Sequence, residues 1–93
     1  MEFKDLEWRS WHDGISSTTD FDNGFRLSIV AGSGKYCTPR TMGDSPDEFS
    51  TFEVAVFNPQ GGWSTQDFIE TDDMVAGWQS RENINELIKK INK

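Results

Sequence analysis

The chain has few of the residues that carry out chemistry. Among its 93 residues it has one histidine, His12, and one cysteine, Cys37. A single cysteine allows no disulfide within the chain, and these two residues are too few for a structural zinc site. Turn-forming residues follow His12 and polar residues surround Cys37, so we interpret them as a surface residue and an incidental thiol. We therefore expect no catalytic residue, no metal and no cofactor, in a protein that is not an enzyme.

Positive charge and long apolar runs are also scarce. Nine basic side chains against sixteen acidic ones give a net charge of −7, which opposes contact with nucleic acid or an anionic membrane. No apolar run approaches the roughly 20 residues that cross a bilayer. The N-terminus lacks the basic and then apolar pattern of a signal peptide. These features predict no nucleic-acid partner, no membrane partner and a place in the cytosol.

Aliphatic residues are few, and aromatic residues replace them. The hydrophobic share is 34% and the aromatic share 13%, with four tryptophans and seven phenylalanines. Bulky rings must therefore supply much of the core. A chain of 93 residues has the length of one domain, so we expect a single domain over 1–93.

The end of the chain has the pattern of an amphipathic helix. Apolar side chains recur with the spacing of one helical stripe, at Ile84, Leu87, Ile88 and Ile91. Ser80 is a good N-cap residue, and lysines at the end match the sign of the helix dipole. The pattern predicts a helix over 81–92.

The rest of the chain has the pattern of strands and turns. Alternation of apolar and polar residues predicts strands over 6–11, 15–21, 25–31, 49–57 and 74–79, with a short strand starting at Trp63. The pair Asn23 and Gly24 predicts a two-residue hairpin turn before the third of these strands. The fold class is therefore α+β, with a meander-like antiparallel sheet of four to six strands and the C-terminal helix packed on one face. The predicted core comprises Leu6, Trp8, Phe25, Leu27, Ile29, Phe52, Val54, Val56, Val75, Ile84, Leu87, Ile88 and Ile91.

Two loops are candidates for a site. The loop 32–48 is long for a small domain, and it opens with Gly-Ser-Gly-Lys after a strand. This is not the Walker spacing, so a plain turn is the first interpretation; the alternative is a small ligand or nucleotide bound by Lys35, Tyr36 and Arg40. The loop 65–73 carries four carboxylates, on Asp67, Glu70, Asp72 and Asp73. Their spacing fits no calcium loop, and a solvated negative loop is the simpler interpretation.

Aromatic side chains outside the core are the remaining candidates. If 6–11 is a regular strand, Trp8 and Trp11 lie on opposite faces of it, and Trp78 shares a face with Met74 and Ala76. Only one face of the sheet can pack on the helix, so Trp11 and Phe57 are expected to stay partly exposed on the other. An exposed aromatic ring with acidic neighbours is a usual anchor for a protein partner.

A resemblance to known proteins is carried by the segments 3–11 (FKDLEWRSW), 22–30 (DNGFRLSIV), 32–36 (GSGKY), 52–57 (FEVAVF) and 73–91 (DMVAGWQSRENINELIKKI). These segments cover more than half of the chain, and together they resemble a group of small uncharacterised proteins of tailed bacteriophages. The segments build the fold and carry no catalytic signature. The resemblance implies an origin in a phage genome and action in the infected bacterial cytosol, where small acidic phage proteins often bind and inhibit a host enzyme or defence factor.

Our first hypothesis is thus a non-enzymatic phage accessory protein that binds and modulates a host bacterial protein. The predicted partner-binding residues are Asp67, Glu70, Asp72, Asp73, Trp11 and Phe57. The alternative hypothesis is a small-ligand or nucleotide binder that uses the loop 32–40.

Overall fold

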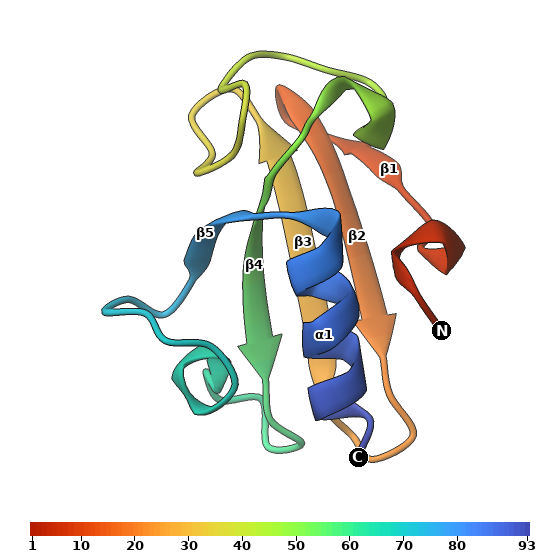
Figure 1. The fold of residues 1–93 in the computed structure, drawn as a ribbon, viewed down its shortest axis with the longest axis vertical. Coiled ribbons are helices and arrows are strands. Elements are labelled where there is room, and N and C mark those ends of the chain that lie inside the picture. The colour runs from red at the N-terminus through yellow and green to blue at the C-terminus, as the bar shows by residue number, and fades with distance from the viewer.

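The computed structural model describes residues 1–93. The chain forms one antiparallel sheet with a helix on one face. The strands are β1 (Arg9–Trp11), β2 (Gly14–Asp20), β3 (Arg26–Gly32), β4 (Phe52–Phe57) and β5 (Ala76–Gln79), followed by the helix α1 (Arg81–Ile91). Each strand pairs with the next in the chain, so the order is β1-β2-β3-β4-β5 (Figure 1). There are also three short 3-10 helices: η1 (Phe3–Asp5) before β1, η2 (Pro46–Glu48) between β3 and β4, and η3 (Thr65–Asp67) between β4 and β5. The predicted α+β meander is confirmed.

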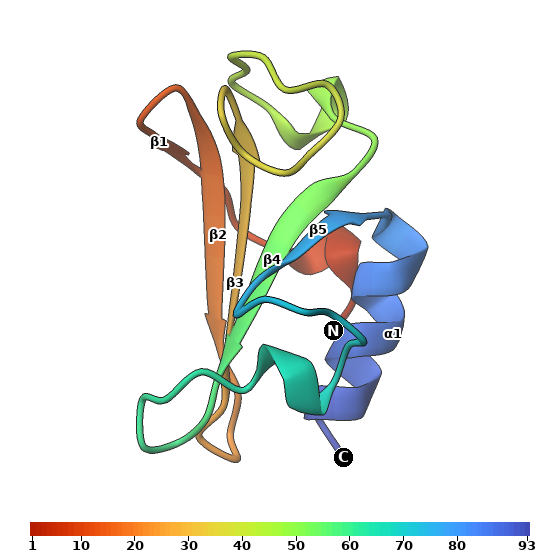
Figure 2. The same ribbon diagram turned by 90° about the vertical axis from the view of Figure 1, so that its left-hand side faces the viewer.

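Helix α1 forms where its sequence pattern places it. The Ser80 hydroxyl accepts a hydrogen bond of 3.1 Å from the backbone N–H of Asn83, which caps the first turn. The four stripe residues are buried, namely Ile84, Leu87, Ile88 and Ile91. The helix ends at Ile91, one residue before the predicted end, because Asn92 is the C-cap. Figure 2 shows that α1 covers one face of the sheet and that no element covers the part of the other face formed by β2 and β3.

The core lies between α1 and the sheet. Its buried members are Leu6, Ile15, Phe21, Leu27, Ile29, Ala31, Cys37, Phe49, Phe52, Val54, Val56, Ala76, Ile84, Leu87, Ile88 and Ile91. Trp8 and Phe25, predicted to be core, are partly buried and pack against this cluster. Val75 is only partly buried, and its neighbour Ala76 takes the core position at 3% exposure. None of the helices has the length and apolar character that crossing a membrane requires.

The β2–β3 hairpin has a longer loop than the sequence predicts. Phe21 and Phe25 close it, since the Phe21 N–H donates to the Phe25 carbonyl at 2.8 Å and the Gly24 N–H donates to the Phe21 carbonyl at 2.9 Å. The loop thus has three residues, with a positive φ of 91° at Gly24 alone, as in a type I turn followed by a glycine bulge. The Asn23 side-chain amide donates to the carbonyl of Ile91 at 2.7 Å and ties this loop to the end of α1.

The edge strand β5 is irregular. Phe52 pairs with Gln79 and Val54 with Ala76, so Gly77 and Trp78 together oppose one residue of β4. Trp78 adopts a positive φ of 54° and is 54% exposed. The prediction that Trp78 shares a face with Ala76 was therefore wrong, because the bulge turns Trp78 outward while Ala76 stays in the core.

The predicted strand bounds at the N-terminus and before β4 also change. The strand expected over 6–11 is limited to β1. The residues before it form η1 and then a segment in which Leu6 is buried in the core and Trp8 packs against it. Trp8 packs against Phe52 with ring centroids 5.6 Å apart, whereas Trp11 lies on the other face and is 40% exposed, so the predicted opposition of the two rings is confirmed. The expected strand 49–57 starts at Phe52. Trp63 forms an isolated bridge with Phe57 and no strand.

Candidate functional site

A tight turn after β4 places two aromatic rings side by side. The Asn58 N–H donates to the Gly62 carbonyl at 2.8 Å, and the Asn58 side-chain oxygen accepts from the N–H groups of Gln60 and Gly62 at 2.9 and 3.0 Å. These bonds reverse the chain and bring Trp63 next to Phe57. The two ring centroids are 4.6 Å apart. Phe57 is half-buried beneath a tryptophan that remains 51% exposed.

A cleft of about 220 Å³ opens beside Trp63. Its lining residues come from the η3 region and from the residue that follows the loop 65–73, which we call the acidic loop; they are Trp63, Ser64, Thr65, Gln66, Asp67 and Met74. Met74 is 55% exposed, so it and Trp63 are two large apolar side chains open to solvent at one cleft. The floor is fixed, because Thr65 is 1% exposed and its hydroxyl accepts a bond of 2.9 Å from the Val56 N–H.

The acidic loop has a defined shape. The Gln66 side-chain amide donates to the Asp73 carbonyl at 3.1 Å, and the Thr71 hydroxyl donates to the Val75 carbonyl at 2.9 Å. The Asp73 carboxylate accepts a bond of 2.7 Å from the N–H of Met74, which orients the residue that lines the cleft. The loop is therefore held by side-chain bonds across its base.

The four carboxylates predicted as a site do not point to one place. Asp67 lines the cleft beside Trp63, and Glu70 lines a different groove. Asp72 and Asp73 are exposed. None of the four takes part in the three ion pairs of the molecule, which are Lys4–Glu2, Arg26–Asp20 and Lys89–Glu86. The loop therefore presents four carboxylates that form no ion pair within the chain.

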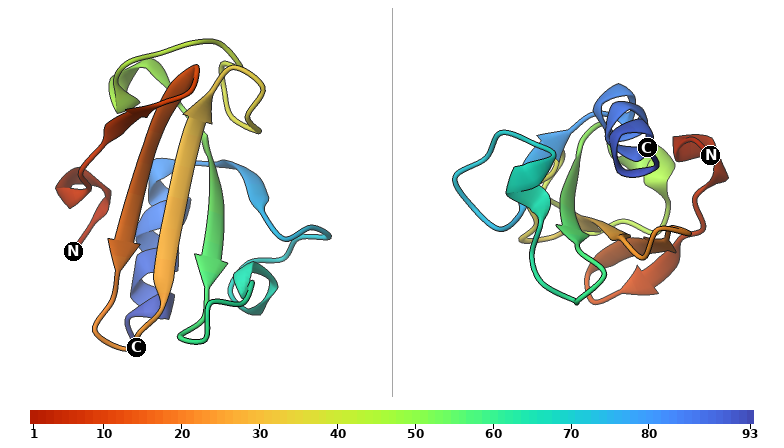
Figure 3. Two further views of the ribbon diagram at one scale, coloured as in Figure 1. Left: turned by 180° about the vertical axis from the view of Figure 1, so that it is seen from behind. Right: turned by 90° about the horizontal axis from the view of Figure 1, so that it is seen from below.

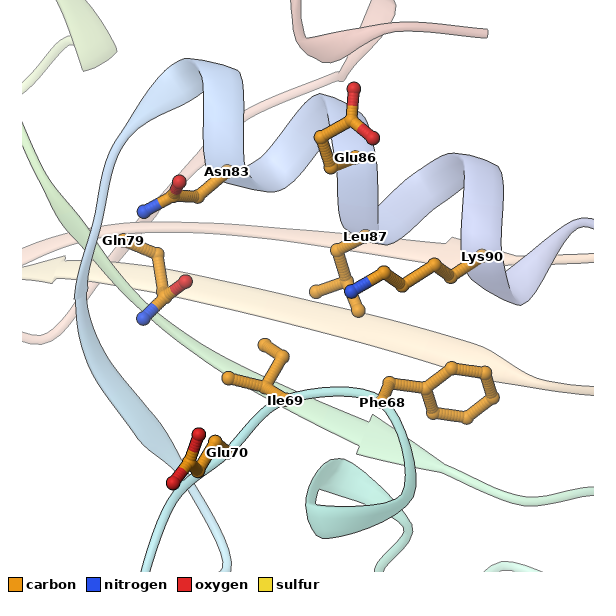
Figure 4. A pocket seen from close by; sticks show the side chains of 8 residues that line it. All are labelled: Phe68, Ile69, Glu70, Gln79, Asn83, Glu86, Leu87 and Lys90. Carbon is orange, nitrogen blue, oxygen red and sulfur yellow. The ribbon is translucent and has the colours of Figure 1, made fainter.

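The groove that includes Glu70 lies between the acidic loop and α1 and has a volume of about 370 Å³ (Figure 4). Its residues are Phe68, Ile69, Glu70, Gln79, Asn83, Glu86, Leu87 and Lys90. Ile69 and Leu87 lie on facing sides of the groove, and Leu87 is only 2% exposed. The ring of Phe68 packs edge-on against Phe25 at 5.5 Å. The groove thus offers little apolar surface, and it is the seam along which the loop packs on the helix.

Trp11 lies at the opposite end of the sheet from Phe57. It closes the β1–β2 hairpin, where it pairs with Gly14, while Phe57 ends β4 opposite Arg26. The Lys35 ammonium lies 4.9 Å from the centre of the Trp11 ring. The structure therefore groups Trp11 with the loop 32–40 and not with the acidic loop.

The basic and aromatic residues of the loop 32–40 contact one another and their own backbone. The Arg40 guanidinium donates to the Lys35 carbonyl at 2.9 Å and lies 5.4 Å from the centre of the Tyr36 ring. Tyr36 stacks on Trp78 with centroids 5.4 Å apart, and its N–H donates to the Glu53 carboxylate at 3.0 Å. A ligand bound by Arg40 and Tyr36 would have to displace these contacts.

The cysteine and the histidine both have structural surroundings. Cys37 is 1% exposed, and its sulfur accepts from the Gly32 N–H at 3.3 Å and lies 3.3 Å from the Pro39 carbonyl. It is a core residue that holds the loop closed. His12 has a positive φ of 54° in the β1–β2 turn and packs edge-on against Trp11 at 4.5 Å. No group of three or more histidine, cysteine, aspartate or glutamate side chains gathers in the arrangement that a metal ion needs.

Comparisons of the chain with protein-family models, with curated proteins and with solved structures found no match. The relation to phage proteins therefore stays a prediction. Of the residues that the sequence singled out, Asp67 lines the Trp63 cleft and Phe57 packs against the Trp63 ring. Trp63 and Met74 were not among the residues predicted from the sequence to form a site. The signal that could have found them is their position, since the two large apolar residues flank the acidic segment on either side.

Proposed function

We propose that the chain is a non-enzymatic binding protein whose acidic, aromatic surface engages a basic surface of a host bacterial protein. The binding surface is the Trp63 surface, which we define as Phe57, Trp63, Asp67, Met74 and the acidic residues at 70, 72 and 73. The observation that carries the proposal is the exposure of Trp63 and Met74 at one cleft beside Asp67, a carboxylate that forms no ion pair.

The apolar part of this surface would supply the affinity. Trp63 and Met74 are 51% and 55% exposed, and tryptophan is among the residues that most often dominate the energy of protein interfaces. Methionine adapts its shape to different neighbours and contacts aromatic rings favourably. Phe57 packs against the tryptophan ring with centroids 4.6 Å apart, which restricts the orientations open to the ring before any partner binds.

The acidic part would select the partner and speed association. Asp67 lines the same cleft as Trp63, so a lysine or arginine side chain could lay its stem along Trp63 and Met74 and place its charge on the carboxylate. The other three carboxylates extend the negative field around the cleft, which favours encounter with a basic surface.

The bacterial and phage setting of the proposal rests on the sequence resemblance alone. In that setting the binding would modulate a host enzyme or defence factor in the infected cytosol. Support for a binding role, and not a catalytic one, comes from Cys37, whose sulfur is enclosed and hydrogen-bonded, and from His12, whose ring packs on Trp11.

An affinity capture from bacterial lysate tests the proposal with a matched pair of variants. The double variant Trp63→Ala, Met74→Ala should lose a partner that the wild-type protein captures in a stoichiometric amount. Met42→Ala is the control, because Met42 is 70% exposed and lies outside the cleft. A partner that the double variant captures as well as the wild type does would exclude the Trp63 surface, provided that thermal melts show both variants folded.

A further inference from the structure

The uncovered face of the sheet holds a third hollow, a cavity that shares no lining residue with the Trp63 cleft. It has a volume of about 480 Å³ and is lined by Arg9, Trp11, Ser16, Thr18, Asp20 and Arg26. These residues belong to β1, β2 and the start of β3, whereas the Trp63 cleft lies beyond the end of β4. Figure 3 shows this face of the sheet from behind, with the strands in view and α1 on the far side.

The floor of the cavity contains a recessed hydroxyl without a partner. Ser16 is only 9% exposed, lines the cavity and makes no hydrogen bond through its side chain. The only fully enclosed side-chain polar atom without a hydrogen-bond partner is the Ser17 hydroxyl. The Ser16 hydroxyl also has no partner, so it must remain accessible. Recessed polar groups in proteins are nearly always hydrogen-bonded. Because the Ser16 oxygen has no partner within the chain and lies at this cavity, it is available to hydrogen-bond a ligand there.

Of the two arginines that line the cavity, only Arg9 has no carboxylate partner. Arg26 binds Asp20 through two contacts of 2.6 and 3.2 Å, so these two charges cancel each other. Arg9 forms no ion pair, although the protein as a whole has a net charge of −7. Lys35 adds a second cation near the cavity, with its ammonium 4.9 Å from the centre of the Trp11 ring. The acidic loop lies beyond the opposite edge of the sheet, and salt screens charges separated by more than about 8 Å at physiological ionic strength.

We propose that this cavity binds the oxyanion group of a small molecule, a carboxylate or a phosphate, between Arg9 and the hydroxyls of Ser16 and Thr18. A guanidinium offers paired N–H donors that match two oxygens of such a group, and each hydroxyl offers one more donor. The Trp11 ring at the same cavity provides a flat apolar surface for the rest of the ligand.

Titration of the ¹⁵N-labelled protein followed by amide NMR spectra tests the proposal. The probes are inorganic phosphate and glutamate, added separately, with sodium chloride adjusted to keep the ionic strength constant. The amide signals of Ser16 and Thr18 should shift in a saturable way with at least one probe. Saturation by phosphate alone or by glutamate alone identifies which oxyanion the cavity prefers, and saturation by both indicates a general oxyanion site.

Variants with matched controls connect the binding to these residues. Arg9→Gln should raise Kd at least about tenfold, since it removes the charged donor, and Ser16→Ala about threefold. Lys93→Gln changes the net charge equally and Ser28→Ala removes a hydroxyl outside the cavity, so both should leave Kd within about twofold. If Arg9→Gln does not fold, Arg9→Lys should still weaken binding, because lysine lacks the planar fork.

Two results would contradict the proposed oxyanion site. Shifts that grow linearly with both probes, and equal those caused by sodium chloride, would overturn the proposal. An unchanged Kd in a folded Arg9 variant would overturn it as well. Because the Trp63 surface is not part of this cavity, neither outcome affects the proposed protein-binding function.

Discussion

Ser17 lies on the helix-facing side of β2 and carries the one enclosed hydroxyl of the molecule that has no hydrogen-bond partner. The residue is 2% exposed and pairs across the sheet with Ile29, which is fully buried. Its neighbours on this face are apolar core residues, so the hydroxyl gives up its water without gaining a partner. We predict that Ser17→Ala stabilises the protein, although most substitutions of buried residues destabilise.

The size of the effect follows from the cost of an unsatisfied buried polar group, which is about 1–3 kcal/mol. Alanine removes the oxygen and keeps the Cβ, so it leaves a space of only one atom and loses little packing. A small cavity penalty reduces the gain, and we expect a net increase of about 1 kcal/mol in the free energy of unfolding. For a domain of this length that corresponds to a rise in Tm of roughly 4–8 °C.

Thermal and urea unfolding of Ser17→Ala, measured beside wild type, give the result directly. Ser28→Ala is the matched control, because Ser28 lies on the uncovered face and is only partly buried, so its removal should change stability by less than about 0.5 kcal/mol. A Tm for Ser17→Ala below that of wild type would refute the reasoning. It would mean that the Ser17 hydroxyl has a partner in solution, such as a backbone carbonyl or an enclosed water.

Three other perturbations have predicted outcomes. Ile88→Asp should unfold the domain, because Ile88 is 1% exposed and burying an unpaired carboxylate there costs several kcal/mol. Glu86→Ala, on the exposed side of the helix, should change the stability little. Thermal melts followed by circular dichroism measure both effects. Ser80→Ala should lower stability by about 1 kcal/mol in urea unfolding, and no change would mean that water caps the first turn. The hydrogen bond from Arg26 lowers the pKa of the Asp20 carboxyl, so Arg26→Gln should raise this pKa in an NMR titration. Because the folded pKa is depressed, the pair stabilises the fold above the unfolded pKa, and this small contribution is lost as the pH falls through the folded pKa.

The sequence predicted the helix and the meander because local rules govern them. The stripe of α1 and its Ser80 cap depend only on neighbours within a few residues. The alternation in β3 and β4 likewise places Leu27, Ile29 and Val54 in the core, as found. Where the short-range pattern and the tertiary packing agree, the sequence alone is enough to predict the element and its buried face.

The bulge in β5 could not be predicted, because its cause lies in another part of the chain. A Cβ on Gly77 would lie 2.6 Å from the Cβ of Tyr36, so the glycine permits a close approach of the loop 32–40. The Trp78 N–H donates to the Tyr36 carbonyl at 2.8 Å, which takes it away from the sheet ladder. Similarly, Cys37 is in the core because the loop folds back on Gly32, a contact that no periodicity reveals.

The candidate site was predicted in part. The sequence indicated the acidic loop and Phe57, but exposure of Trp63 and Met74 depends on how the turn at Asn58 directs the chain. Trp11 was grouped with the acidic loop by residue type, and the strand order places it at the other end of the sheet.

Association kinetics with the captured partner test most directly whether the Trp63 surface binds a basic protein partner. The variant Asp67→Asn, Glu70→Gln, Asp72→Asn, Asp73→Asn removes four charges and keeps an acceptor oxygen at Asp73 for the Met74 N–H. At low salt the wild type should associate at least about tenfold faster than this variant, and the two rates should converge at 1 M salt, where the Debye length falls to about 3 Å. Equal association rates for the two folded proteins at low salt, independent of salt, would contradict the account.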